Sequence, residues 1–142
     1  MAGYHQALAE TGLEAKAELV CYGEFTLASG YDMAQQALTC RPRPTALFAA
    51  NNFIAIGALR ALRDAGLRVP EDMTLVAFDD LPPAFVIDPF LTVAAQPAYQ
   101  MGHKATELLL TRLSGQSPAE YQHIVLPTEM IVRRSSGPPA ER

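Results

Sequence analysis

Four side chains of kinds that bind small polar molecules each come directly or shortly after a segment that is predicted to be a β-strand. They are Phe25, Asn51, Asp79 and Gln96. A carboxylate accepts hydrogen bonds, a side-chain amide both donates and accepts them, and an aromatic face stacks on apolar ring surfaces. Together these groups suit a polyhydroxylated or heterocyclic ligand, such as a sugar or a purine. They do not suit an anion, because no Arg or Lys joins the set.

The hydrophobic pattern around these residues alternates between strands and helices. The predicted strands cover residues 18–22, 46–50, 74–78 and 92–95, and the predicted helices cover residues 2–11, 28–40, 53–65 and 98–114. Strand 46–50 contains no polar residue, so we expect it to be buried on both faces. This alternation is typical of an α/β fold in which a parallel sheet is flanked by helices on both faces. Ligands of such sheets bind beyond the carboxyl ends of the strands, where the four side chains are expected to meet.

Each candidate also has a purely structural interpretation. Asn52 is expected to be the N-cap of helix 53–65, because Asn favours that position, which leaves Asn51 as the ligand residue. Asp79 and Asp80 are neighbours and cannot both face one crevice, so we expect Asp79 to contact the ligand and Asp80 to bond loop backbone. Phe25 could instead belong to the core. Gln96 could instead cap the helix that follows it.

Several classes of function find no support in the sequence. The formal net charge is −4 and no basic run exceeds the pair 133–134, so the chain itself is not expected to bind DNA. The histidines His5, His103 and His123 have no partners at the spacing of metal ligands. The sequence also contains no nucleophile elbow and no Gly-rich phosphate loop. We therefore expect neither an enzyme nor a metal site nor a cofactor.

The cysteines and the N-terminus bear on the compartment. Cys21 and Cys40 are expected to be free thiols, because the sequence shows no secretion signal. No apolar run reaches the ~18 residues of a membrane span. The expected location is the cytoplasm, without a membrane partner.

Two long segments carry a resemblance to a known family. "TALFAANNFIAIGALRALRDAGLRVPEDMTLVAFDDLPPAF" followed by "PFLTVAAQPAYQMGHKATELLL" resembles the effector-binding core of the lactose/galactose (LacI-type) repressors. The resemblance implies two similar α/β subdomains around a cleft, a homodimer and an N-terminal helix-turn-helix head that binds DNA. It implies effector contacts at Phe25, Asn51, Asp79 and Gln96. The sequence would then be the C-terminal subdomain of a periplasmic-binding-protein-like fold, truncated at its N-terminus.

The resemblance also implies how the chain is divided. Residues 1–96 would form the C-terminal subdomain, and residues 97–127 would be a crossover helix and strand of the other subdomain. Residues 128–136 would be a strand that returns to the C-terminal subdomain, and residues 137–142 would be a flexible tail. Strands are expected at 123–127 and 129–134. Helix 98–114 keeps an apolar face although its partners would lie outside this sequence. We therefore expect 97–127 to be mobile, swapped onto a second molecule, or packed in a non-native way.

Two functions remain open at this stage. The first is the effector-sensing and dimerisation part of a bacterial repressor, which the segment "RVPEDMTLVAFDD" favours, and the second is a fragment of a periplasmic-type sugar-binding protein for uptake. The dimer interface of the first is expected to include Ile54, Ile56, Phe85, Val86 and Ile87, because apolar residues in the loop 81–90 need an explanation. The alternative is that this loop folds back on its own core.

Overall fold

The described strands form a four-stranded sheet of mixed direction. The computed structural model describes residues 1–82, 88–116 and 120–139. The strands are β1 (Ala46–Ala49), β2 (Thr74–Phe78), β3 (Thr92–Ala95) and β4 (Glu129–Ile131), and they lie in the order β1-β2-β3-β4. The first three run parallel and β4 runs antiparallel to β3. The expected α/β fold with a mostly parallel sheet is confirmed.

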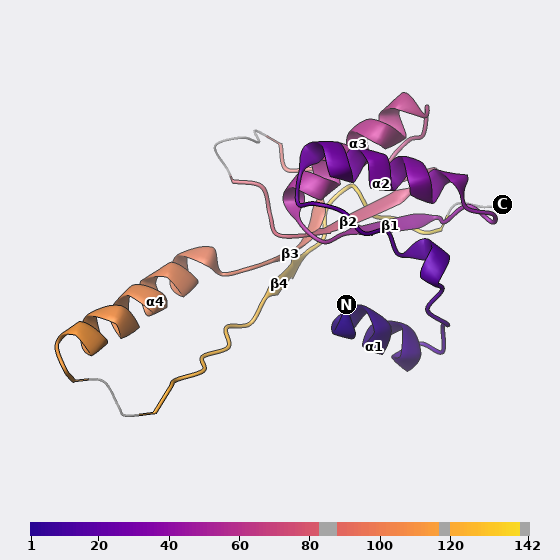
Figure 1. The fold of residues 1–142 in the computed structure, drawn as a ribbon. Coiled ribbons are helices and arrows are strands. Elements are labelled where there is room, and N and C mark those ends of the chain that lie inside the picture. The colour runs from indigo at the N-terminus through magenta and orange to yellow at the C-terminus, as the bar shows by residue number, and fades with distance from the viewer. Residues whose placement is uncertain (83–87, 117–119, 140–142) are drawn as a thin grey trace.

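Two of the helices pack together on one face of this sheet. The helices are α1 (Ala2–Glu10), the 3-10 helix η1 (Ala17–Leu19), α2 (Leu27–Thr39), α3 (Asn52–Asp64) and α4 (Ala98–Leu113). In Figure 1, α2 and α3 lie together above β1 and β2. The strand register places Leu75, Ala77 and Val93 on the face below α3, where all three are fully buried. We call α2, α3 and the four strands the body.

Two glycines let α2 and α3 approach closely. A Cβ atom on Gly57 would lie 2.1 Å from the carbonyl oxygen of Leu27, and one on Gly30 would lie 2.4 Å from the carbonyl oxygen of Ile54. Backbone atoms cannot move out of the way as a flexible side chain can. The sequence therefore requires glycine at both positions, and the first turns of the two helices are held side by side.

The opposite face of the sheet is open. Phe48 is 59% exposed and Met130 is 61% exposed, and both point away from α3. The expectation that strand 46–50 is buried on both faces was therefore wrong, as was the expectation of packed helices on both faces, at least among the described residues. α1 lies on this side of the sheet in Figure 1 but buries none of its own residues.

The segment 18–22 is not a strand, which corrects a second expectation. Its backbone bonds locally, because Leu19 N–H donates to Lys16 O (3.0 Å) and Val20 N–H donates to Ala17 O (3.1 Å). An apolar β-prone stretch becomes a strand only where a neighbour offers a ladder of hydrogen bonds, and here the local bonds win. The expected strand 123–127 is likewise absent from the structure, and the strand expected at 129–134 is the shorter β4.

The return segment, residues 132–137, joins the amino ends of β2 and β3. Ser135 is fully buried, and its Oγ donates to Leu75 O (2.6 Å) and accepts from Thr92 N–H (2.7 Å). Its backbone N–H donates to Phe90 O (3.1 Å), and its carbonyl accepts from Leu75 N–H (2.8 Å). A buried hydroxyl that is fully hydrogen-bonded stabilises the fold, so this serine fixes the end of the chain to the sheet.

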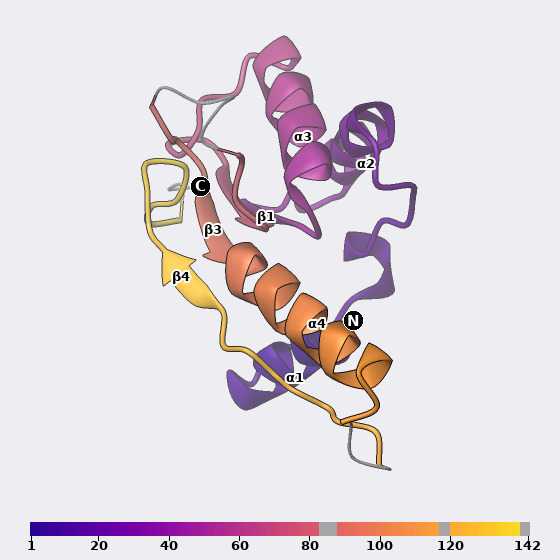
Figure 2. The ribbon, with the colours of Figure 1, turned by 90° about the vertical axis from the view of Figure 1, so that its left-hand side faces the viewer.

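Residues 97–116 and 120–127, which we call the α4 arm, project away from the body (Figures 1 and 2). None of the residues of α4 is buried, and Leu109, Leu110 and Leu113 are between 57% and 75% exposed. An open hollow of about 360 Å³ lies between α4 and residues 122–128. Among the described residues, no helix has the length and apolar character needed to cross a membrane.

Candidate functional site

Asp79 and Gln96 meet at the carboxyl edge of the sheet. β2 and β3 are neighbouring parallel strands, so the residues that follow them emerge side by side. Gln96 Nε2 donates a hydrogen bond to Asp79 Oδ1, and both side chains are half-buried. Asp79 N–H donates to Ala94 O (3.0 Å), which continues the ladder between the strands for one more rung. Two of the four expected site residues are therefore in direct contact.

Asp79 has an unusual backbone conformation. Its φ is +69°, and no other non-glycine residue that the structure describes has a positive φ. The left-handed region costs an L-residue about 1–2 kcal/mol, although Asp tolerates it better than most. Such strain persists where surrounding contacts fix the backbone, and it occurs often at functional sites. The turn directs Asp79 toward Gln96 and sends Asp80 in another direction.

The cap of α3 is Asn51 and not Asn52, which corrects another expectation. Asn51 is the N-cap of α3, with extended backbone (φ −156°, ψ 174°), and its Oδ1 accepts from Ile54 N–H (2.8 Å). Asn52 donates from Nδ2 to Asp80 O (3.0 Å). The helix begins one residue earlier than expected, so Asn51 takes the extended position that a cap requires. Both side chains stay half-buried at the same edge of the sheet as Asp79.

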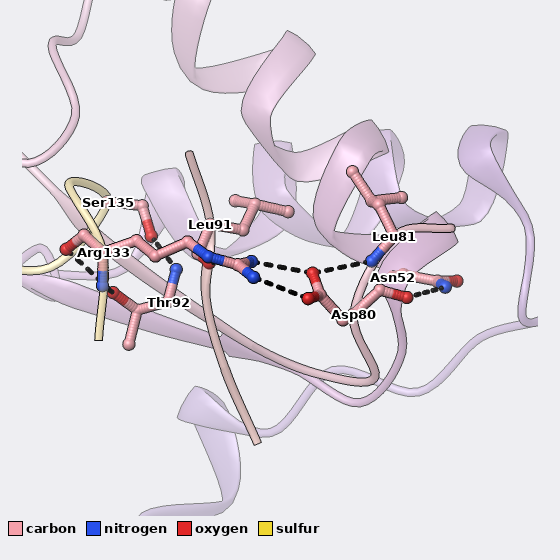
Figure 3. A network of polar contacts seen from close by, with 7 residues as sticks. All are labelled: Asn52, Asp80, Leu81, Leu91, Thr92, Arg133 and Ser135. Carbon is pink, nitrogen blue, oxygen red and sulfur yellow. Dashed lines mark hydrogen bonds and ion pairs between the residues drawn. The ribbon is translucent and has the colours of Figure 1, made fainter. Parts of the chain in front are cut away.

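Asp80 makes an ion pair that sequence reasoning missed. Arg133 Nη1 donates to Asp80 Oδ1 (2.7 Å) and Arg133 Nη2 donates to Asp80 Oδ2 (2.6 Å). The same carboxylate accepts from Leu81 N–H (2.8 Å), as expected of a residue that bonds loop backbone. In Figure 3, the Arg133 side chain lies between Leu91 and Asp80, and Asn52 approaches Asp80 from the other side. No spacing in the sequence pointed to Arg133, which lies far from Asp80 along the chain.

Electrostatics favours the charged form of this pair. The Arg133 guanidinium beside Asp80 lowers the pKa of that carboxyl, with a smaller contribution from the Leu81 N–H, although partial burial opposes the shift. The hydrogen bonds to Asp80 raise the pKa of Arg133 above its usual value. Bidentate pairs of this type are stronger than a hydrogen bond between neutral groups. The pair therefore fixes Asp80, directly after β2, to the return segment.

Phe25 is not brought into contact with the other candidates. It is 68% exposed and precedes Thr26, the N-cap of α2. The strand expected before it is absent, so the reason for placing it at the sheet edge was wrong. Among the described residues, no hydrogen bond, ion pair or ring contact joins it to Asp79 or Gln96. It still lies close to the corner, because the first turn of α2 touches α3 at Gly57.

The residues expected at a dimer interface are only partly described. Ile54 is 9% exposed and belongs to the hydrophobic core of its own chain. Ile56 is half-buried. Phe85, Val86 and Ile87 lie outside the described residues. The interface stays a prediction.

The hollow beside α4 adjoins the Asp79 edge through Gln96. Gln96 contributes to its lining, together with Met101, Lys104 and residues of segment 122–128. It is shallow and lies on the arm, between the two segments that leave the body. Within residues 1–82, 88–116 and 120–139, no group of three or more His, Cys, Asp or Glu side chains could hold a metal ion.

Comparison with known proteins identifies the family. The family described as "Periplasmic binding protein-like domain" matches residues 1–136 of this chain. The chain belongs to this family. Within it, the chain resembles the LacI-type regulators, since similar solved structures include several that are described as LacI-family transcriptional regulators.

Curated relatives give the same classification. The regulator CelR of Thermobifida fusca is 39% identical over 133 residues, an alignment that covers 94% of this chain and 39% of CelR. The repressor CytR of Escherichia coli K12 is 36% identical over 134 residues, which cover 94% of this chain and 39% of CytR. Both are described as HTH-type transcriptional regulators or repressors, and not as enzymes. The chain spans about two-fifths of the length of these relatives.

One solved structure also has a bound sugar. The complex of the transcriptional regulator CelR with cellobiose superimposes with a TM-score of 0.86 at 39% identity, covering 94% of this chain and 41% of that one. The LacI-type resemblance that was read from the sequence is therefore confirmed as a family relationship.

Proposed function

We propose that this chain is the effector-sensing portion of a bacterial transcriptional repressor of the LacI type, and that its effector is a sugar. The observation that carries the proposal is the contact between Asp79 and Gln96 at the carboxyl edge of a parallel sheet. Parallel sheets of this kind bind their ligands at that edge. The cellobiose bound to the similar CelR structure favours a sugar over a nucleobase.

The side chains at the edge match the needs of a polyhydroxylated ligand. The Asp79 carboxylate accepts hydrogen bonds from two sugar hydroxyls, and the Gln96 amide both donates and accepts. Asn51 donates from Nδ2, because its Oδ1 caps α3. Gln96 already holds Asp79 in place, so part of the site is preorganised before the ligand arrives. Phe25 supplies an exposed aromatic face that stacks on the apolar side of a sugar ring.

Our proposal includes the division of the chain and its partners. Residues 1–96 with 128–136 form one subdomain, and the α4 arm belongs to a second subdomain that closes the other side of the cleft. The unburied apolar face of α4 supports this division. DNA is bound through a helix-turn-helix in the full repressor, which acts in the cytoplasm as a homodimer. The uptake protein is the less favoured function, because the relatives CelR and CytR are HTH-type regulators.

Sugar titration of the repressor that contains this chain tests the proposal. Isothermal titration calorimetry with cellobiose and a panel of mono- and disaccharides is expected to find one sugar that binds. Asp79→Asn is expected to abolish that binding while leaving the fold intact, because Asn also tolerates a positive φ. Asp32→Asn, on the exposed side of α2, is the matched control. Full binding by Asp79→Asn, or the absence of binding by every sugar, contradicts the proposal.

Self-association is tested separately by sedimentation velocity at micromolar concentration. A dimer is expected, and Ile56→Ala is expected to weaken it more than Leu59→Ala, a half-buried neighbour on the same helix. A wild-type monomer at this concentration contradicts the dimer.

A further inference from the structure

Arg133 joins the two ends of the loop between β2 and β3. Its guanidinium donates to both carboxylate oxygens of Asp80, at the start of the loop, and from Nη1 to Leu91 O (3.0 Å), at the end of the loop. The side chain is only 18% exposed, so these bonds lie largely out of water. One side chain from the return segment therefore fixes both ends of the loop that carries Asp79 (Figure 3).

Arg133 is itself held firmly. Its backbone N–H donates to Thr92 Oγ1 (2.9 Å), and Thr92 Oγ1 donates to its carbonyl oxygen (3.0 Å). Ser135, two residues later, is bonded to both β2 and β3. The backbone of Arg133 is therefore anchored to the sheet, and its guanidinium offers Asp80 a fixed partner.

The strained turn at Asp79 depends on contacts on both sides. Asp79 N–H bonds Ala94, and Asn52 bonds the carbonyl oxygen of Asp80. Without the ion pair of Asp80, the φ of Asp79 would be free to relax toward a negative value. This rotation turns the Asp79 carboxylate away from Gln96. A left-handed residue persists only where its surroundings fix it, and Arg133 makes the strongest of these contacts.

We propose that Arg133 is a positioning residue for the effector site, which acts through Asp80 to keep Asp79 in its left-handed conformation against Gln96. The inference rests on the proposed function, because it assigns to Arg133 the orientation of a ligand-binding carboxylate. Arg133 does not touch the ligand. It sets the fraction of molecules in which the site is ready to bind, and apparent affinity falls in proportion to that fraction.

The first test needs no ligand. Amide hydrogen exchange, measured residue by residue by NMR, is compared between wild type, Arg133→Gln and Arg134→Gln. Arg134 is the matched control, because it is the adjacent arginine and its ion pair with Asp88 is mostly exposed. Arg133→Gln is expected to speed exchange at residues 79–81 by about tenfold or more and to leave Leu75–Ala77 unchanged. Arg134→Gln is expected to change neither. Unchanged exchange at 79–81, or an equal rise throughout β2, overturns the proposal.

The second test uses the sugar that wild type binds. Arg133→Gln is expected to weaken binding about tenfold, and Arg133→Lys less, because Lys keeps the charge but not the bidentate geometry. Asp80→Asn is expected to weaken binding similarly, and the double variant Arg133→Gln/Asp80→Asn no further, since both act through one contact. Additive losses overturn the proposal. If Arg133→Gln does not fold, Arg133→Lys provides the comparison in both tests.

The two proposals fail in different ways. If wild type binds no sugar, the proposed function fails, but the exchange rates at residues 79–81 still decide whether Arg133 positions Asp79. If wild type binds a sugar and Arg133→Gln binds it equally well, only the inference about Arg133 fails.

Discussion

The body and the α4 arm use similar amphipathic helices with opposite results. α3 buries Ile54, Ala58 and Leu62 among others, whereas α4 is three residues longer and buries none of its residues. Leu62 is fully buried and Leu109 is 57% exposed, although both lie on the apolar face of their helix. An amphipathic pattern therefore shows that a helix needs a partner, but it does not show that the partner lies within the same stretch of sequence.

The difference comes from what surrounds each helix. α3 meets α2 at two glycines and lies on β1 and β2, so its apolar side chains leave water. Beside α4, across an open hollow, lies the returning chain, residues 122–128. An isolated helix of this length is only marginally stable in water. The two regions should consequently differ in local stability.

Hydrogen exchange should show the largest difference. Amides inside β2 exchange only when the body opens, which slows them by a factor on the order of 10³ or more, while α4 amides exchange nearly as fast as those of a free peptide. NMR-detected exchange on the 142-residue chain measures both regions in one sample. Uniform protection of β2 and α4 would show that α4 is packed in solution and would remove the contrast.

Shortening one leucine in each region should give the next largest effect. Leu62→Ala removes a fully buried side chain and should lower the free energy of unfolding by about 2–5 kcal/mol. Leu110→Ala should change it by less than about 0.5 kcal/mol. Urea denaturation monitored by circular dichroism measures both. Equal losses would mean that Leu110 has a packing partner.

Replacing a glycine by alanine should change the stability of the two regions in opposite directions. Gly57→Ala places a Cβ against the backbone of α2 and should destabilise the body by about 1–3 kcal/mol. Gly102→Ala meets nothing within 4 Å in α4 and should stabilise that helix by roughly 0.5–1 kcal/mol. Thermal unfolding and helical ellipticity report the two changes. A neutral Gly57→Ala would show that α2 and α3 can separate at no cost.

Acid should produce the smallest difference, through one carboxylate in each region. Asp80 has a lowered pKa in the folded chain, so its stabilising effect is present above its unfolded value of about 3.9 and is lost as the pH falls through the lower folded value. Wild type should therefore lose on the order of 1 kcal/mol more than Asp80→Asn between neutral and acid pH. Glu107, whose pKa is lowered by exposed Lys104, should contribute nothing measurable, and Glu107→Gln should follow wild type. The free energy of unfolding is measured against pH for each variant. Parallel curves for wild type and Asp80→Asn would exclude a stabilising ion pair.

The sequence was informative wherever local pattern and burial agree. The strands 74–78 and 92–95 appear with the expected bounds, and helices α2, α3 and α4 differ from expectation by a residue or so at their ends. The expected meeting of Asp79 with Gln96 followed from parallel topology alone, because that topology determines which residues share an edge.

Sequence reasoning failed where a residue depends on a distant partner. Segment 18–22 has a strand-like composition but bonds locally, and Phe48 looks like a core residue but faces the open side of the sheet. Asn51 rather than Asn52 caps α3 because the helix starts one residue earlier than expected. Arg133 could not be found, because its partner Asp80 lies 53 residues earlier and no local pattern links them.

The buried Ser135 has a consequence for synthesis of the chain. It completes the hydrogen bonding of Leu75, which precedes it by 60 residues. At 5–20 residues per second, the ribosome adds Ser135 roughly 3–12 s after Leu75. During that interval β2 carries a backbone donor and acceptor that only the incoming return segment can pair. The body therefore reaches its final sheet late in translation, and a ribosome that stalls in the α4 arm would hold a nascent chain whose sheet is still open at its amino end.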